Sequence, residues 1–398
     1  MQNNPLDSIG NFLWIFIIIG LSIMYPRMMT QQILLKLDQV YFMVEDLNAK
    51  AKKHIAKKIG KDVSKDVKES INHFMEFFAI DPVSLDPYGI VKKIDFINEL
   101  AEKKFKYFVK QIAPHLDEES KADLVMGLSG AVMLNQIGKI IKHFSELIRK
   151  TKNLQYALIM QMQLPMIEKM IKALAKGTEA MTNGWAIGDS IGPLVVAEMI
   201  GDSKTKEIAD ETVACEKTIA GRSVIIIKAR GPGGRLGKLG RSVEKIVKSK
   251  KISKIMTIDA AAKLEGEKTG LIAEGVGVAI GGPGVDKSYI ENLAVQKDIP
   301  LDTIIVKMGQ EEAIMPMRQE VLGSINNVIN LIEKNIKETP GKGSIIIVGV
   351  GNSTGIGDNK KAAELAKTKI KKTLEFLKRR GDLEDEKKGG KFNKWFES

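Results

Sequence analysis

The sequence predicts an α/β protein with an amino-terminal transmembrane helix, a helical middle region and a mostly parallel sheet covered by helices. Three observations support this order. Residues 8–26 carry no charge, and residues 30–182 show apolar side chains at helical spacing. Residues 183–380 alternate short β-branched runs with amphipathic stretches. The chain of 398 residues is long enough for two domains of ordinary size.

The first element, residues 8–26, has the length of a bilayer-spanning helix, which needs about 20 apolar residues and at least about 17. Asp7 precedes this run, whereas Arg27 and the lysines of residues 50–61 follow it. The positive-inside rule therefore places the bulk of the chain in the cytoplasm. A cleaved signal peptide would need a basic start and small residues at a cleavage site, and this segment has neither. We expect an uncleaved, single-pass anchor whose partner is the lipid bilayer of the cell membrane.

The middle region, residues 30–182, is predicted to be helical. Ile33, Leu37 and Val44 recur at helical spacing directly after the anchor. They predict either packing within the domain or pairing with a second copy, so a homo-oligomer stays open. Prolines within residues 82–114 divide the region into separate helices. We find no catalytic constellation in this part of the sequence.

Strand-like and helix-like segments alternate from about residue 183. The predicted strands are 223–228, 254–258, 275–280, 303–306 and 344–350, and the predicted helices are 193–199, 239–248, 288–294, 312–336 and 360–377. Continuous apolar strands are typical of a parallel sheet that is buried on both faces. Residues 381–398 are charged and have little to bury, which predicts a disordered tail.

The composition excludes some classes of function. A single cysteine, Cys215, rules out a disulfide framework within one chain and fits a reducing compartment. The four histidines precede the aspartate-rich region and lack zinc spacing, which argues against a histidine-rich metal site. The net charge is +12, with basic clusters at residues 50–61 and 371–380. These clusters indicate solvated helix faces or attraction to anionic lipid. Aromatic and basic residues are not interleaved as they are in proteins that bind single strands, which argues against nucleic acid as a partner.

Polar residues at the predicted strand ends form the main candidate site. Asp189 opens a helical stretch, Asp259 ends an apolar strand, and Asn352 follows a Gly-x-Gly turn. Carboxyl ends of parallel strands gather at one edge, so we expect these side chains to meet there. Two adjacent carboxylates would shift each other's pKa and divide acid and base roles. They could instead hold a divalent cation, or simply cap helices. Asp358, which also opens a helical stretch, is a third acidic candidate.

The turn after the strand at 223–228 offers an alternative site. Its glycines and cations, at the start of a helix, predict binding of phosphate or another anion. The predicted anion-binding residues are Arg230, Gly231, Gly233, Arg235 and Lys238. Neither the P-loop pattern nor the dinucleotide pattern fits, because Pro232 and Leu236 occupy glycine positions. A tight turn without a ligand is the other interpretation.

Four short segments resemble those of hydrogenase-maturation and spore-germination peptidases. Residues 188–193, Gly-Asp-Ser-Ile-Gly-Pro, resemble a Gly-Asp-x-x-Gly-Pro segment of both groups. Residues 258–262, Ile-Asp-Ala-Ala-Ala, and 282–285, Gly-Pro-Gly-Val, are similar to two segments of the germination peptidase. Residues 348–352, Val-Gly-Val-Gly-Asn, resemble the first-strand Gly-x-Gly-Asn signature.

In those peptidases the Gly-x-Gly-Asn strand comes first, whereas here it comes last. The resemblance therefore implies a circularly permuted phosphorylase/peptidase-like fold over residues 183–380. It implies catalytic or metal-binding roles for Asp189 and Asp259. The maturation enzymes use a histidine after the later glycine-rich segment, where this chain has Asp286 and Lys287. That departure argues against nickel binding of their type.

The whole chain also resembles an archaeal family of membrane-anchored proteins of unknown function. The combined hypothesis is a membrane-anchored cytoplasmic protein that hydrolyses a peptide or protein at Asp189 and Asp259. Asn352 would orient the substrate or an activated water. Whether the chain is an enzyme stays open, because two alternatives remain. These are a non-catalytic module that binds a nucleotide or another anion, and a scaffold at the membrane.

Overall fold

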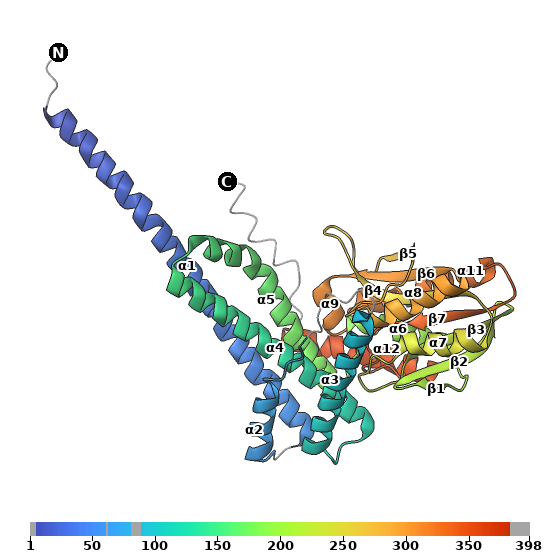
Figure 1. The fold of residues 1–398 in the computed structure, drawn as a ribbon. Coiled ribbons are helices and arrows are strands. Elements are labelled where there is room, and N and C mark those ends of the chain that lie inside the picture. The colour runs from blue at the N-terminus through green and yellow to red at the C-terminus, as the bar shows by residue number, and fades with distance from the viewer. Residues whose placement is uncertain (1–4, 61–62, 81–88, 383–398) are drawn as a thin grey trace.

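The computed structural model describes residues 5–60, 63–80 and 89–382, apart from the side chains of residues 5–13, 15 and 23. The predicted tail therefore lies outside the described residues, except for Gly381 and Asp382. The chain is a mixed α/β protein with a helical amino-terminal half and a sheet-containing carboxyl-terminal half (Figure 1).

The helical half is built around one long helix, α1 (Pro5–Ile59), which packs against α4 (Glu118–Thr151) and α5 (Leu154–Thr182). Helices α2 (Lys65–Phe74) and α3 (Ile90–Ile112) flank this bundle. Leu37 and Val44 of α1 are fully buried with residues of α4 and α5. The stripe that follows the predicted anchor therefore packs within the chain.

One helix of the described part of the chain, α4, is long and apolar enough to cross a membrane. Half of its apolar window is buried. Leu124, Leu128 and Ile141 of α4 belong to the core shared with α1 and α5. This burial accounts for the apolar character of α4, since helices in the core of a soluble protein can be equally long and apolar.

The carboxyl-terminal half contains a seven-stranded sheet in the order β1-β2-β3-β7-β4-β6-β5. The strands are β1 (Lys206–Ala209), β2 (Thr212–Ile219), β3 (Arg222–Ala229), β4 (Ile252–Ala262), β5 (Ile272–Val276), β6 (Leu301–Met308) and β7 (Ser344–Gly349). The central strands β3, β7, β4 and β6 are parallel, whereas β1, β2 and β5 run antiparallel to their neighbours. The sheet is thus mixed rather than mostly parallel. The strands β1 and β2 escaped prediction because charged residues interrupt their apolar pattern.

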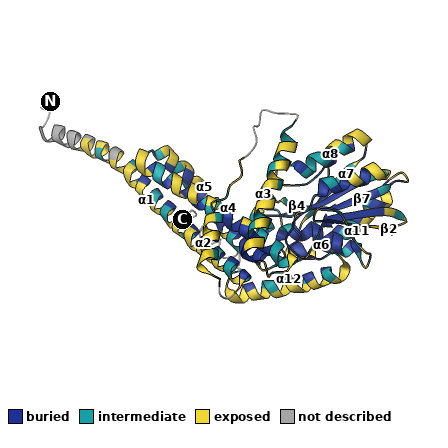
Figure 2. Ribbon diagram, turned by 60° about the horizontal axis from the view of Figure 1, so that its bottom comes forward, coloured by how far each residue is buried: buried dark blue, intermediate teal, exposed yellow. Residues whose placement is uncertain are grey.

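Helices cover both faces of the sheet, as Figure 2 shows by the dark strands between them. One face carries α6 (Ile191–Ile200), α11 (Ile325–Glu338) and α12 (Lys360–Arg380), and the other carries α7 (Leu239–Ser249) and α8 (Val285–Lys297). In β7, Ile345 and Ile347 join the first core, whereas Ile346 and Val348 join the second. This alternation follows from the period of two in a strand.

The predicted helix at 312–336 is three helices: α9 (Gln310–Ile314), α10 (Gln319–Gly323) and α11. Pro316 lies between the first two, where a proline cannot donate the next helical hydrogen bond. Gly323 ends the second, and glycine weakens a helix interior. The chain therefore turns twice before α11 covers the sheet.

The two ends of the sheet-containing half lie side by side. Arg380, at the end of α12, donates hydrogen bonds of 2.6 and 2.7 Å to both carboxylate oxygens of Glu179 in α5. The rings of Trp185 and Phe376 lie 5.9 Å apart in an edge-to-face arrangement. The start of this half, near residue 183, is therefore fixed against its last helix.

Candidate functional site

Glycines allow the start of α6 to touch the backbone of the central strands. A Cβ atom on Gly192 would overlap the carbonyl oxygen of Val350 and would lie 2.5 Å from that of Ile258. Gly351 has a φ of +124°, and a Cβ there would overlap the carbonyl oxygen of Asp189. The glycines of the Gly-Asp and Gly-x-Gly-Asn segments thus permit direct contact between helix and strand ends.

This contact brings Asp189 and Asp259 together. The short helix η1 (Gly188–Ser190) carries Asp189 to the end of β7, where Asp259 is the residue after the last pair between β4 and β7. Asp259 lies within β4, opposite Ile305 of β6, rather than at the end of the strand. Its side chain is buried, whereas Asp189 keeps part of its surface in contact with solvent.

Both carboxyl groups have a raised pKa. Desolvation raises the pKa of Asp189, and the backbone N–H of Asn352, which donates a 2.7 Å hydrogen bond to its Oδ2, opposes that rise. Desolvation and then the charge of Asp189 hold the pKa of Asp259 well above its usual range. Within the described part of the chain, neither carboxylate has an ion-pair partner. The pair is therefore suited to holding one proton between two acidic side chains.

Asn352 contributes to this site through its backbone. Its side-chain Oδ1 accepts hydrogen bonds from the N–H of Thr354, at 2.8 Å, and from the hydroxyl of Thr354, at 2.6 Å. These bonds fix the turn after β7, while the backbone N–H of Asn352 points at Asp189. The predicted role of its side chain in orienting substrate or water stays a prediction.

Asp358 belongs to a different group of residues. Its Oδ1 accepts a 2.5 Å hydrogen bond from Nζ of Lys228 and a 2.9 Å bond from the N–H of Gly231. Lys228 is fully buried at the end of β3, and burial lowers its pKa despite this partner. Asp358 therefore neutralises a buried lysine and fixes the glycine-rich turn.

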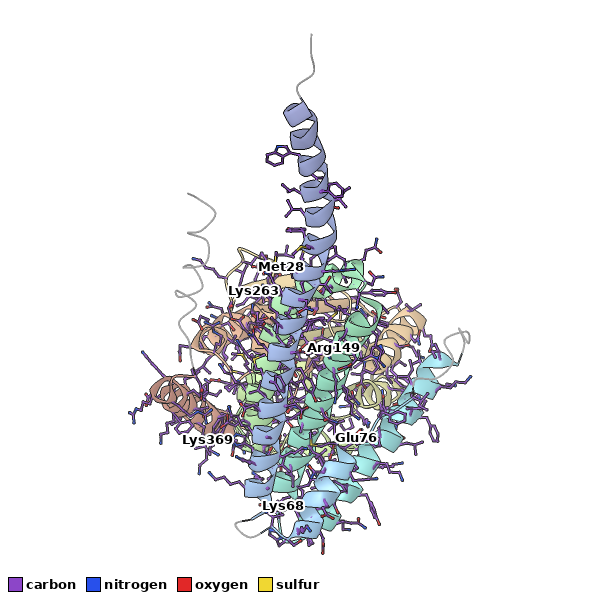
Figure 3. The ribbon with its side chains drawn as sticks, turned by 90° about the vertical axis from the view of Figure 1, so that its left-hand side faces the viewer. Met28, Lys68, Glu76, Arg149, Lys263 and Lys369 are labelled. Carbon is purple, nitrogen blue, oxygen red and sulfur yellow. The ribbon has the colours of Figure 1, made fainter. Side chains whose placement is uncertain are left out.

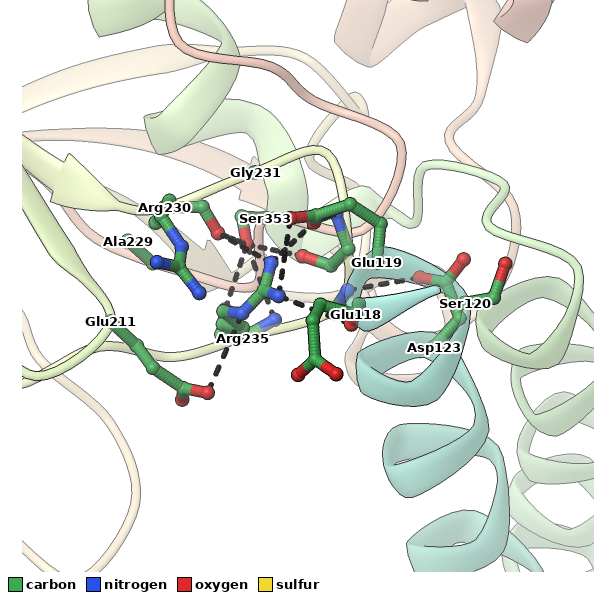
Figure 4. A network of polar contacts seen from close by, with 12 residues as sticks. Glu118, Glu119, Ser120, Asp123, Glu211, Ala229, Arg230, Gly231, Arg235 and Ser353 are labelled. Atoms are coloured by element: carbon green, nitrogen blue, oxygen red, sulfur yellow. Dashed lines mark hydrogen bonds and ion pairs between the residues drawn. The ribbon is translucent and has the colours of Figure 1, made fainter. Parts of the chain in front are cut away.

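The glycine-rich turn at 230–238 binds carboxylates of its own chain (Figure 4). The N–H of Gly233 donates a 2.6 Å hydrogen bond to Glu119 of α4. Arg235, which is only 3% exposed, donates a 2.5 Å bond to the same carboxylate. The N–H of Gly234 donates a 2.9 Å bond to Asp123, one turn further along α4. The amides and the arginine of the turn thus pair with carboxylates of the first two turns of α4, and the binding of a free anion by this turn stays a prediction.

Charge explains the ionisation state of Glu119. Burial would raise the pKa of this carboxyl group, but hydrogen bonds from Arg235 and Gly233 outweigh burial and lower it. Asp123 shows the opposite balance. Its burial outweighs the attraction of Lys58 and the N–H of Gly234, and raises its pKa to about 7. Glu119 is thus the ionised partner of the turn.

The remaining predicted anion-binding residues also have carboxylate neighbours. Arg230 lies 3.1 Å from Glu207, and Lys238 lies 2.9 Å from Glu102 of α3. Arg230, Arg235 and Lys238 all line a cleft between the helical half and the sheet. A free anion would therefore approach them from that cleft.

The metal alternative rests on the same two aspartates. Among the described residues, no group of three or more His, Cys, Asp and Glu side chains could hold a metal ion. Two carboxyl groups with raised pKa values favour a bound proton, whereas a divalent cation prefers ionised oxygen ligands. A divalent cation would bind the ionised form of these oxygens and lower both pKa values, so metal binding at Asp189 and Asp259 stays a prediction.

Two family models match the chain. The model described as the amino-terminal domain of a protein of unknown function, DUF1512, matches residues 11–184. The model of the DUF1512 carboxyl-terminal domain matches residues 187–357. This chain belongs to the DUF1512 family. The search of curated proteins and the search of solved structures each found no match.

The boundary between the two DUF1512 domains falls between the end of α5 at Thr182 and the start of η1 at Gly188. The glycine-rich turn belongs to the second domain, and its partners Glu119 and Asp123 belong to the first. The contacts around Arg235 therefore join the two domains of this DUF1512 protein.

Sequence analysis missed three residues that determine these sites. Glu119 and Asp123 lie more than 100 positions before the turn that they contact, and no local pattern links them to it. Lys228 did leave a signal, because a lysine after three isoleucines is a charge within a buried strand. Such a lysine requires a carboxylate nearby, which is Asp358.

Proposed function

We propose that this DUF1512 protein hydrolyses peptide bonds at the membrane surface, with Asp189 and Asp259 as the acid–base pair. The observation that carries the proposal is the coupling of two carboxyl groups of raised pKa where η1 meets β4 beside the end of β7. The charge of Asp189 favours the protonated form of Asp259. Asp189 is then the base and Asp259 the acid.

The chemistry follows from these protonation states. Asp189 accepts a proton from a water molecule as the water oxygen attacks the peptide carbonyl carbon. Asp259 donates its proton to the nitrogen of the leaving amine, and the C–N bond breaks. The products are a carboxylic acid and an amine, and the two side chains have exchanged protonation states. Proton exchange with solvent restores the pair.

The permuted peptidase-like fold is part of the proposal. A circular permutation requires the two ends of a domain to lie close together. The contacts of Arg380 with Glu179 and of Trp185 with Phe376 meet this requirement. The contact of Gly351 with Asp189 joins the Gly-x-Gly-Asn strand directly to the Gly-Asp helix start. Joining residue 380 to residue 183 by a short linker, and opening the chain before β7, should give a protein that still folds.

We also propose that the amino-terminal part of α1 anchors the protein in the cell membrane, with the rest in the cytoplasm. Figure 3 shows this part of the helix extending beyond the body, which it leaves near Met28. The described large apolar side chains there are exposed: Trp14, Phe16, Ile17, Ile18, Ile19, Leu21, Met24, Tyr25 and Met28. Exposing an apolar surface of this extent to water raises the free energy, and burying it in lipid lowers the free energy.

Hydrolysis is tested with the full-length protein in lipid nanodiscs and a library of quenched fluorescent peptides. Asp189→Asn and Asp259→Asn should each lower the rate of cleavage about 10²–10⁴-fold, the usual contribution of acid–base groups. Asp302→Asn is the matched control, since Asp302 lies on β6 and pairs with Lys254. Cleavage at the wild-type rate by both site variants would contradict the proposal.

The anchor is tested by extraction of cell membranes with alkaline carbonate. The wild-type protein should stay in the pellet, whereas a variant carrying Ile18→Lys and Leu21→Lys should move to the supernatant. Central lysines cost about 2.5–3.5 kcal/mol each in a spanning helix. Leu35→Lys and Phe42→Lys, at exposed positions further along α1, are the control and should leave the protein in the pellet.

The binding of an anion or nucleotide by Arg230, Arg235 and Lys238 is the second candidate function. It is favoured by the cleft that these residues line between the two domains. Isothermal titration of the same nanodisc preparation with ATP and with inorganic phosphate tests it. Saturable binding of either ligand supports this function, and absence of both contradicts it.

A further inference from the structure

The cleft between the two domains has a volume of about 600 Å³. Helices α3 and α4 form one wall, and the turn at 230–238, the loop at 280–284 and the helices α7 and α8 form the other. Sites for small organic ligands usually measure about 300–1,000 Å³. The cleft is therefore large enough for a molecule of several hundred daltons that touches both domains.

Much of the cleft wall is apolar. Phe105, Val109 and Val125 line it from the helical domain, and Leu236 and Ile280 line it from the sheet domain. Leu236 is 57% exposed although it lies in the turn that joins the domains. An apolar ligand group that covers these side chains would remove apolar surface from water. The wall thus favours a hydrophobic chain or ring system.

Several cationic side chains line the cleft. Arg230, Lys106 and Lys238 are among its cationic side chains, which outnumber its carboxylates. Lys106 lies 2.7 Å from Glu102 and 2.9 Å from Glu211, so part of this charge is already balanced. Arg230 pairs with Glu207 but keeps 35% of its side-chain surface exposed, so it can also contact an anion in the cleft.

Two buried donors of the cleft lack acceptors. The Nε atoms of Arg230 and Arg235 have no hydrogen-bond partner among the described residues. Nε of Arg235 lies 3.4 Å from Glu211, an ion-pair contact without a hydrogen bond. Buried polar groups without partners are rare in native proteins, and each one needs an explanation. Both Nε atoms are closed off from solvent, so an anion in the cleft would contact the exposed part of the Arg230 side chain instead.

We propose that this cleft binds an amphiphilic anion, a molecule with an apolar chain or ring system and a phosphate or carboxylate group. The apolar part lies against Phe105, Val125 and Leu236, and the anionic group lies at Arg230. The inference deepens the second candidate function, because it names the class of ligand for the same cations. It is independent of hydrolysis at Asp189 and Asp259.

The test is isothermal titration of the full-length protein in neutral-lipid nanodiscs, with empty nanodiscs as the blank. Octyl phosphate is the probe, and inorganic phosphate and octanol carry its two parts separately. Octyl phosphate should bind at least ten-fold more tightly than either. Equal affinity for inorganic phosphate, or no saturable binding of octyl phosphate, would overturn the inference. Binding of ATP alone would also overturn it, while leaving the anion-binding function intact.

Two variants place the ligand within the cleft. Ser129→Trp puts an indole into the cleft from an exposed position on α4 and should weaken binding of octyl phosphate more than ten-fold. Arg230→Gln, which keeps the backbone of the turn, should weaken octyl phosphate and leave octanol unchanged. Ile140→Trp is the matched control, on the same helix and outside the cleft lining. Wild-type affinity in both cleft variants would contradict the assignment.

Discussion

Two groups of acidic residues lie on opposite sides of one loop, and their environments differ. The loop after β7 donates the N–H of Asn352 to Asp189 on one side and that of Ser353 to the carbonyl of Arg235 on the other. Asp189 and Asp259 interact electrostatically and have no cationic partner among the described residues, and the pKa of each is raised. Glu119 faces Arg235, and its pKa is lowered.

The difference teaches which carboxylates join domains and which are available for chemistry. An arginine and backbone amides keep Glu119 ionised and fix α4 to the sheet domain. Burial without a cation raises the pKa of both aspartates, which favours the protonated form that the proposed hydrolysis requires. Four variants test this contrast.

Arg235→Met should have the largest effect on stability. It removes a buried guanidinium and leaves Glu119 with fewer partners. Breaking a buried ion pair costs about 3–5 kcal/mol, and we expect about 2–4 kcal/mol here because Glu119 keeps contact with water. Urea unfolding measures the loss. A loss below about 1 kcal/mol would mean that the turn does not join the domains.

Asp123→Asn should change the dependence of stability on pH. The pKa of Asp123 rises from 3.8 to about 7 on folding, so its contribution is fully present below pH 3.8. That contribution is lost as the pH rises through about 7. The asparagine variant does not lose it, and should gain about 3–4 kcal/mol on wild type between pH 4 and pH 8, since each pKa unit corresponds to about 1.4 kcal/mol. Parallel curves for the two proteins would contradict the raised pKa.

Gly192→Ala should separate the start of α6 from the strand ends. The new methyl group overlaps backbone oxygens of Val350 and Ile258, which cannot move without disturbing the sheet. Overpacking of this kind costs about 1–3 kcal/mol. Gly281→Ala is the control, because a Cβ there has no atom within 4 Å. Equal melting temperatures for the two variants would contradict the claim that position 192 must be glycine to allow contact with the strand ends.

Glu207→Gln should have the smallest effect. Its carboxylate lies 3.1 Å from the guanidinium of Arg230 at the surface of the protein. Such exposed ion pairs contribute about 0–1 kcal/mol to the free energy of unfolding. Salt should remove most of that difference in an unfolding experiment. A larger loss would place Arg230 in the junction between the domains.

The sequence predicted the parts of this molecule that depend on local pattern. The β-branched runs located the strands β3, β4, β6 and β7, whereas the predicted strand at 275–280 shares only Gly275 and Val276 with β5. The Gly-Asp and Gly-x-Gly-Asn segments indicated where helix and strand ends would meet. The edge strand β1 and its neighbour β2 were missed because charged residues at their solvent-facing positions interrupt the apolar pattern. The contacts of Glu119 and Asp123 could not be predicted, since they depend on how two domains pack.

The central claim is that Asp189 and Asp259 are coupled. Nuclear magnetic resonance of protein labelled at the aspartate side-chain carboxyl carbon measures the pKa of Asp259 directly. In the wild type this pKa should lie well above 3.8, and in the Asp189→Asn variant it should fall, because a neighbouring negative charge has been removed. The same pKa in both proteins would contradict the account.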